Sequence, residues 1–146
     1  MAVLVDTNVL LRLLQPHHPH GPIAERALTM LRSKGEVLNV ASQNLVEFWA
    51  VATRPIVENG LGLSSEQAMG EMNALKRLFG LLPELPLQDA WELLVTKHAV
   101  LGKNTHDARL VAAMLVHQVD SILTFNVQDF NRYSGITVLD PRALAP

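Results

Sequence analysis

The chain has 146 residues, a hydrophobic fraction of 49% and a formal net charge of −2, which fit a single domain with a sizeable core. It contains no cysteine, which excludes disulfides and thiol chemistry. It has no basic excess, so any affinity for nucleic acid has to come from local features. No apolar run approaches the roughly 18 residues of a membrane-spanning helix, and the first residues do not resemble a signal peptide. We therefore expect one cytoplasmic domain over residues 1–146, with no membrane partner and with room for an apolar patch that a protein partner covers.

Strands and helices are predicted to alternate along the chain. The β-branched run at 2–6 predicts a buried strand, and Thr7 begins a helical pattern that Thr7 or Asp6 could cap. The remaining elements of the first half are helix 22–34, strand 36–40, helix 42–54 capped by Ser42, and a helix to residue 79 that opens with a capping box at 64–67. Those of the second half are a brief strand within 81–87, helix 88–101, helix 105–117 capped by Thr105, strand 120–125, a helical turn at 127–130 and strand 136–140. This alternation predicts an α/β fold in three layers around a parallel sheet.

Several polar side chains follow strands of the predicted sheet, where an open parallel sheet binds its ligands. Asp6 ends the first strand, and Glu47 lies early in the helix after the second strand. Asp107 lies in the first turn of helix 105–117, and Asn126 and Asp129 follow strand 120–125. We expect these five residues to lie at the same end of the sheet.

Each of these residues also has an ordinary structural interpretation. Asp6 could cap the helix that follows it, and Asp107 could offset the dipole of its own helix. Asn126 fits a turn, and Asp129 fits a cap or a solvated side chain. Glu47 fits such an interpretation less well, because apolar residues surround it in the sequence and no Lys or Arg lies three or four positions away.

Three carboxylates from separate segments would repel one another without a counter-charge. A hard divalent cation, Mg²⁺ or Mn²⁺, would relieve this repulsion, because oxygen ligands favour these ions over zinc. Mg²⁺ uses few carboxylates and keeps several waters, which suits a site completed by a substrate phosphate. The chemistry that this pattern indicates is phosphodiester hydrolysis.

Four stretches of the chain resemble motifs of PIN-domain ribonucleases, in particular of VapC-type toxins of type II toxin–antitoxin systems. In chain order they are VLVDTNVLLRLL, SQNLVEFWAV, THDARLVAAML and ILTFNVQDF. The resemblance runs from residue 2 to about residue 140. The last stretch is similar to the family pattern T-x-[DN]-x-x-[DE]-F. The resemblance implies a PIN-like α/β/α sandwich with a central sheet of about five parallel strands.

The resemblance also implies roles for individual residues. Asp6, Glu47 and Asp107 would be metal ligands or would position metal-bound water. Asn126 stands where many relatives have Asp, and whether Asp129 substitutes for it is left open. The resemblance further implies that Thr7, Asn8 and Thr124 hydrogen-bond around the acids.

The function that these expectations favour is that of a Mg²⁺- or Mn²⁺-dependent endoribonuclease acting on single-stranded RNA, such as a tRNA or rRNA site. The resemblance implies a homodimer and a cognate antitoxin whose tail blocks the acidic cleft. Two alternatives stay open: a PIN nuclease outside toxin–antitoxin pairs, and a catalytically weak module that binds nucleic acid or protein, for which Asn126 would be the sign. A different phosphate-binding fold is disfavoured, because neither G-x-G-x-x-G nor G-x-x-x-x-G-K occurs.

Other residues are assigned no role in the chemistry. The histidines of PHHPHGP lack the spacing of metal ligands on a helix and are expected in an exposed loop. Arg12 and Arg109 are expected at the solvated surface, and Trp49 and Trp91 in the core or a dimer interface.

Overall fold

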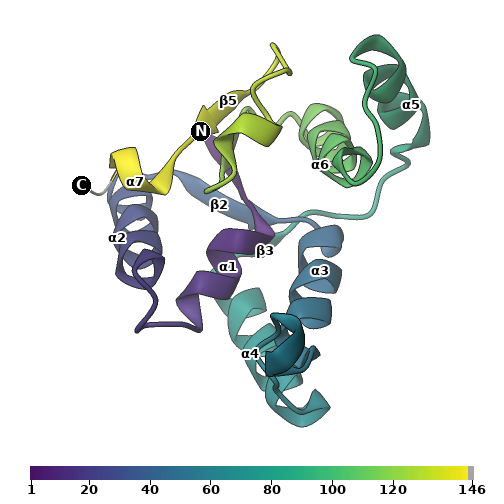
Figure 1. Cartoon of the computed structure of the whole chain (residues 1–146). Coiled ribbons are helices and arrows are strands. Elements are labelled where there is room, and N and C mark those ends of the chain that lie inside the picture. Colours follow the sequence, from purple (N-terminus) through teal and green to yellow (C-terminus); the bar gives the residue numbers. More distant parts are fainter. Residues whose placement is uncertain (145–146) are drawn as a thin grey trace.

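The computed structural model describes residues 1–144, and the last two residues of the predicted domain lie outside this range (Figure 1). Five parallel strands form one sheet in the order β3-β2-β1-β4-β5. The strands are β1 (Ala2–Val5), β2 (Val37–Val40), β3 (Gly80–Leu81), β4 (Ser121–Leu123) and β5 (Thr137–Leu139). The helices are α1 (Thr7–Leu13), α2 (His20–Ser33), α3 (Ser42–Thr53), α4 (Ser65–Leu78), α5 (Gln88–Lys97), α6 (Asn104–His117) and α7 (Pro141–Leu144), with 3₁₀ turns η1 (Ile56–Glu58) and η2 (Val127–Asp129). The predicted fold, an α/β sandwich with a parallel sheet of about five strands, is confirmed.

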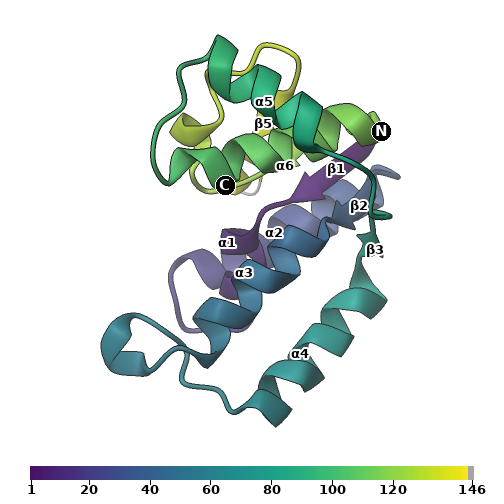
Figure 2. The ribbon, with the colours of Figure 1, turned by 90° about the vertical axis from the view of Figure 1, so that its right-hand side faces the viewer.

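Helices cover both faces of the sheet and divide the core into two parts. Figure 2 shows α5 and α6 above the sheet and α1 to α4 below it. Val3 and Val5 of β1 pack into the lower core with α1, α2, α3 and α4, whereas Leu4 between them packs into the upper core with α6. All three valine and leucine side chains are fully buried, and each such burial contributes roughly 1.5–3 kcal/mol. The uninterrupted apolar run at 2–5 is thus explained by a strand that has a core on each side.

The strand order changes direction next to β1. From β1 the chain builds outward through β2 and β3, then returns to place β4 on the other side of β1 and β5 beyond it. The carboxyl ends of β1 and β4 therefore flank the switch point at which open α/β sheets bind ligands. Asp6 directly follows β1, and Thr124 directly follows β4.

Several predicted element ends differ from those observed. The helix predicted from residue 22 begins at His20, whose backbone N–H donates to Nδ1 of His18 over 3.0 Å. Gly21 is required there, because a Cβ atom would lie 2.3 Å from the backbone oxygen of Gln15. The helix predicted over 88–101 ends at Lys97, since Ala99 has a positive φ of 51°.

Two of the predicted helix caps, Ser42 and Thr105, are wrong, and two, Asp6 and the capping box at 64–67, are confirmed. Ser42 is the first residue of α3, and Ala41 is the residue at the N-cap position. The backbone N–H of Ala41 donates a hydrogen bond to the side-chain oxygen of Asn44. Thr105 lies inside α6 and donates its hydroxyl hydrogen to the Gly102 carbonyl. The capping box at 64–67 is present, with both of its reciprocal hydrogen bonds. Within residues 1–144 no helix is long and apolar enough to span a membrane.

Candidate active site

Asp6 is a buried carboxylate that caps the following helix, which is one of its predicted roles. Its Oδ1 accepts a 2.8 Å hydrogen bond from the N–H of Thr7, so that Asp6 caps α1. Its Oδ2 accepts hydrogen bonds from the Thr124 hydroxyl at 2.8 Å and the Asn8 amide at 3.3 Å. Burial nevertheless raises the pKa of Asp6 to about 6, and the negative charges of Glu47 and Asp129 add to the rise. The carboxylate is therefore held in place, but its hydrogen bonds do not offset the cost of burying its negative charge.

The hydrogen bond between Asp6 and Thr124 belongs to a network across the switch point. The Thr124 hydroxyl also accepts from the Asn8 amide at 3.2 Å and from the backbone N–H of Asn126 at 3.0 Å. The Asn8 side-chain oxygen accepts from the backbone N–H of Phe125 at 3.1 Å. These bonds fix the loop after β4 to the start of α1, next to the Asp6 carboxylate.

Glu47 is positioned by hydroxyl and amide groups. The Thr7 hydroxyl donates to Oε1 of Glu47 at 2.9 Å and accepts from the Asn44 side-chain amide at 3.2 Å. Asn44 is fully buried, and its oxygen accepts from the N–H of Ala41. Glu47, an acid within an apolar helix, therefore has Thr7 as its partner. Because Thr7 lies on α1, no spacing along α3 could have indicated it.

Asp107, in the first turn of α6, faces the other acids. Its pKa is raised to about 7, first by burial and then by the charges of Asp6, Asp129 and Glu47, with a small opposing effect from Arg132. Carboxylates from three other segments therefore lie close enough to disfavour the charge of Asp107. Both ion pairs in the described part of the chain involve other acids, Glu36 and Asp140, so no Lys or Arg there forms an ion pair with this cluster.

The fifth predicted residue, Asn126, lies at the edge of this group. Its side chain is exposed, and the hydrogen bond that joins it to the network comes from its backbone N–H. Asp129, one turn further along in η2, is the residue of this segment whose charge acts on both Asp6 and Asp107. Of the two residues, Asp129 thus belongs to the acidic cluster.

The chemistry of the donor set fits a divalent cation of the Mg²⁺ type. All of the charged donors are carboxylate oxygens, and their repulsion is uncompensated. Within residues 1–144 no group of three or more His, Asp or Glu side chains is arranged to hold a metal ion. Three protein ligands are not required, because Mg²⁺ is usually bound through one or two carboxylates and retains several waters.

His20, the first residue of α2, packs on the loop that supports the site. The ring of His20 stacks on the ring of Phe125 with 4.4 Å between centroids. On α7, Arg142 donates a 2.9 Å hydrogen bond to the Phe125 carbonyl. The sequence patterns did not indicate these contacts with Phe125. They also did not indicate Asn44, or Gln43, whose amide donates to the His106 carbonyl. The available signal was that Asn44 and Gln43 lie three and four residues before Glu47, on the same face of α3.

The fold and the site define a doubly wound α/β protein with an acidic cluster over its switch point. Residues 3–136 match the family model described as the PIN domain. The chain belongs to this family of nucleases, which generally use divalent metal ions. No curated protein shows a significant match to the sequence.

Several solved VapBC structures have the same fold. VapBC2 from Rickettsia felis, bound to a DNA fragment from its promoter, has a TM-score of 0.73 at 14% identity, covering 96% of this chain and 98% of that one. VapBC-1 from nontypeable Haemophilus influenzae has a TM-score of 0.70 at 16% identity, and DNA-bound VapBC from Salmonella typhimurium has 0.70 at 17%. Each of these two alignments covers 97% of this chain and 98% of the other. At these identities the likeness shows a shared fold over nearly the whole chain.

Proposed function

We propose that this protein is a Mg²⁺- or Mn²⁺-dependent endoribonuclease that hydrolyses phosphodiester bonds in single-stranded RNA and acts as the toxin of a toxin–antitoxin pair. The observation that carries this proposal is the convergence of Asp6, Glu47, Asp107 and Asp129 over the switch point, with the pKa of Asp6 and of Asp107 raised by burial and mutual repulsion. Such an arrangement is expected where a cation and a substrate phosphate complete the site.

Asp6, Glu47 and Asp107 are the residues that would hold the cation, either as direct ligands or by positioning its bound water. A bound divalent ion supplies the Lewis acidity that activates water and neutralises the charge developing on phosphate. Thr124 and the N–H of Thr7 hold the Asp6 carboxylate in one orientation, and the Thr7 hydroxyl does the same for Glu47. Asp129 adds negative charge that acts on both Asp6 and Asp107 and would therefore favour cation binding.

An antitoxin is the protein partner in this proposal. The structural neighbours named above are VapBC complexes. A groove of about 490 Å³ between α3 and α4 offers an apolar surface that a protein partner could cover. Val46 and Met69 in this groove are 69% and 45% exposed. A homodimer is also part of the proposal, and light scattering of the purified protein measures it directly.

The experiment that tests the activity is cleavage of a mixed-sequence single-stranded RNA in Mg²⁺, Mn²⁺ or EDTA, with Asp107→Asn as the control. We expect cleavage that requires the metal and is lost in the variant. Absence of cleavage together with absence of Mn²⁺ binding in calorimetry would contradict the proposal and favour a binding module. A small upstream gene for a DNA-binding protein would support the toxin role over that of a nuclease outside such pairs.

A further inference from the structure

Gln43 links α3 to α6 beside the acidic site, through hydrogen bonds with His106 and Arg109. Gln43 lies one helical turn before Glu47 and therefore on the same face of α3. Its amide donates to the carbonyl of His106, the neighbour of Asp107, at 2.8 Å. Its oxygen accepts a 3.3 Å hydrogen bond from the guanidinium of Arg109. The guanidinium of Arg109 is thus joined, through Gln43, to residues that adjoin Glu47 and Asp107. Among the described residues, no Lys or Arg forms an ion pair with the acids of the site.

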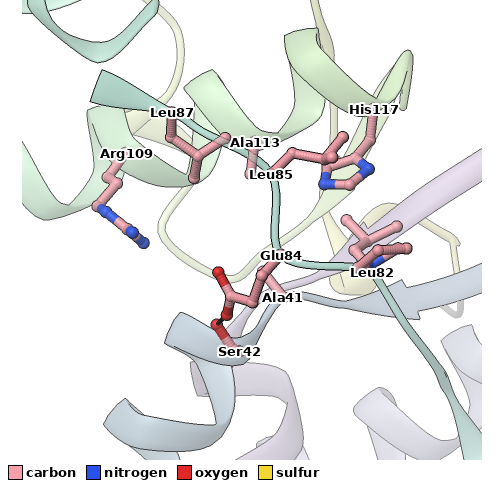
Figure 3. A pocket seen from close by; sticks show the side chains of 10 residues that line it. Ala41, Ser42, Leu82, Glu84, Leu85, Leu87, Arg109, Ala113 and His117 are labelled. Carbon is pink, nitrogen blue, oxygen red and sulfur yellow. Dashed lines mark hydrogen bonds between the residues drawn. The ribbon is translucent and has the colours of Figure 1, made fainter. Parts of the chain in front are cut away.

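Arg109 stands between two adjoining cavities. Figure 3 shows the smaller one, between the start of α3 and α6, with Arg109 extending from α6 toward the side where Ser42 and Glu84 lie. At about 20 Å³ it has room for little more than a water molecule. A hydrogen bond between Ser42 and Glu84 fastens the β3–α5 connection to α3 across it. The same connection forms a wall of the larger cavity, so this wall is held in place.

The larger cavity has a volume of about 330 Å³, at the lower end of the range of small-ligand pockets. Its lining consists of an aromatic ring, aliphatic side chains, one amide and one cation: Leu85, Pro86, Leu87, Gln88, Trp91 and Arg109. The indole N–H of Trp91 donates to the Thr105 carbonyl at 2.9 Å, which anchors the ring against α6 two residues before Asp107. Trp91 is therefore a fixed surface close to the first turn that carries a site acid.

We propose that this cavity binds one nucleobase of a single-stranded RNA, with Arg109 contacting a phosphate between that base and the bond that is cut. This inference rests on the proposed function and adds a subsite to it. An anchored aromatic ring provides a stacking surface for a base, and a guanidinium binds phosphate through charge-assisted hydrogen bonds. The chain as a whole carries a charge of −2, so affinity for a polyanion depends on local cations such as this one.

The alternative cavity for a base, the α3–α4 groove, fits less well. Its lining is Ser42, Leu45, Val46, Trp49, Met69 and Met72, which includes no cation and one hydroxyl. The cavity beside Trp91 has both the cation and a hydrogen-bonded link to residues that adjoin the acidic cluster.

The two tryptophans of the chain allow a direct test. In an Asp107→Asn background, which keeps the RNA intact, Trp49→Phe leaves Trp91 as the only indole, and Trp91→Phe leaves Trp49. We expect a mixed-sequence single-stranded oligoribonucleotide in Mg²⁺ to quench the fluorescence of the first variant and not of the second. An oligomer of equal length without bases should bind without quenching Trp91.

Affinities measured by anisotropy of the labelled RNA complete the test. Trp91→Ala should weaken binding by roughly 5- to 100-fold, the range for loss of one stacked base. Arg109→Ala should weaken binding and make its salt dependence shallower, whereas Arg109→Lys, which keeps the charge, should retain most of the affinity. Arg109 is exposed, so its variants should fold even if Trp91→Ala does not.

The outcomes separate this inference from the proposed function. RNA that binds and is cut while Trp91 is unquenched and the Arg109 variants keep full affinity would overturn the subsite and leave the nuclease standing. Variants that bind RNA normally but lose affinity for the antitoxin would assign the cavity to a protein and overturn the proposal. A wild-type protein that neither binds nor cuts RNA would overturn the proposed function and the subsite with it.

Discussion

The hydroxyl of Thr7 donates a 2.9 Å hydrogen bond to Oε1 of Glu47, which lies 40 positions further along the chain. Because the same hydroxyl accepts from the buried amide of Asn44, its hydrogen is directed toward the glutamate. Thr7 begins α1 directly after the Asp6 cap, so one short segment after β1 contributes one acid and orients another. The orientation of Glu47 therefore depends on the position of α1 against α3.

Replacing Thr7 with valine should lower kcat/KM for RNA by roughly 10- to 100-fold, the usual cost of losing a residue that orients a metal ligand. The shape is preserved while the hydrogen bond to Glu47 is lost. Thr7→Ser should retain most of the activity. Thr53→Val is a matched control, because the Thr53 hydroxyl donates to the Trp49 carbonyl on the same helix as Glu47. Equal losses in Thr7→Val and Thr53→Val would argue against the positioning role.

Asp107→Asn should abolish cleavage and at the same time raise the thermal stability of the metal-free protein by a few degrees. The variant removes a charge that burial and the neighbouring carboxylates disfavour. Calorimetric melting in EDTA measures the stability, and single-turnover RNA cleavage measures the activity. The control is Asp89→Asn, since Asp89 also lies in the first turn of a helix but is exposed. A fully active Asp107→Asn enzyme would refute the assigned role.

The parts of the fold that the sequence predicted are those encoded by local patterns. The apolar run at 2–5, the capping box at 64–67 and the alternation of strands and helices are visible without tertiary contacts, and they placed the acids at one end of the sheet. Ser42 and Thr105 failed as predicted caps, because a cap depends on backbone geometry that residue type alone does not determine.

The supporting contacts of the site could not be predicted from patterns along the chain. Gln43 meets His106 across 63 positions, and Asn44 meets Thr7 across 37. Arg109 and Trp91 look like surface and core residues in the sequence, and only the packing of α6 against α5 brings them to one cavity.

Two buried hydroxyls at β4 allow a matched comparison. Thr124→Val removes the hydrogen bond to Asp6 and leaves the Asn126 N–H without its acceptor, so we expect a loss of about 1–3 kcal/mol in the free energy of unfolding and a 10- to 100-fold loss of activity. Ser121 is equally buried, and its hydroxyl has no hydrogen-bond partner among the described residues. Ser121→Ala should therefore be neutral or slightly stabilising and fully active. Urea unfolding measures the stability of both variants, and an RNA cleavage assay measures their activity.

Asp129 should matter more than Asn126, although the resemblance to PIN-domain motifs implies a site role for the position of Asn126. Asp129→Asn should weaken Mn²⁺ binding and lower cleavage about tenfold, because its charge acts on both Asp6 and Asp107. Asn126→Ala should change little, since the network uses its backbone N–H. Calorimetric titration with Mn²⁺ gives the affinities. A larger effect at Asn126 than at Asp129 would reverse this assignment.

The free energy of unfolding of the metal-free protein should fall as the pH rises from about 4 to about 7. The pKa of Asp6 is about 6 and that of Asp107 about 7 in the folded state, both above the ordinary value of 3.8. Between these values the folded chain binds more protons than the unfolded chain, so the free energy of unfolding decreases with pH and then levels off above about 7.

Mg²⁺ requires the ionised carboxylates, so its stabilising effect should grow over the same range. Melts in EDTA and in Mg²⁺ at pH 5 and pH 8 measure both trends, and Asp107→Asn should flatten the EDTA profile. Stabilisation by Mg²⁺ that is equal at both pH values would show that the ion binds away from these acids.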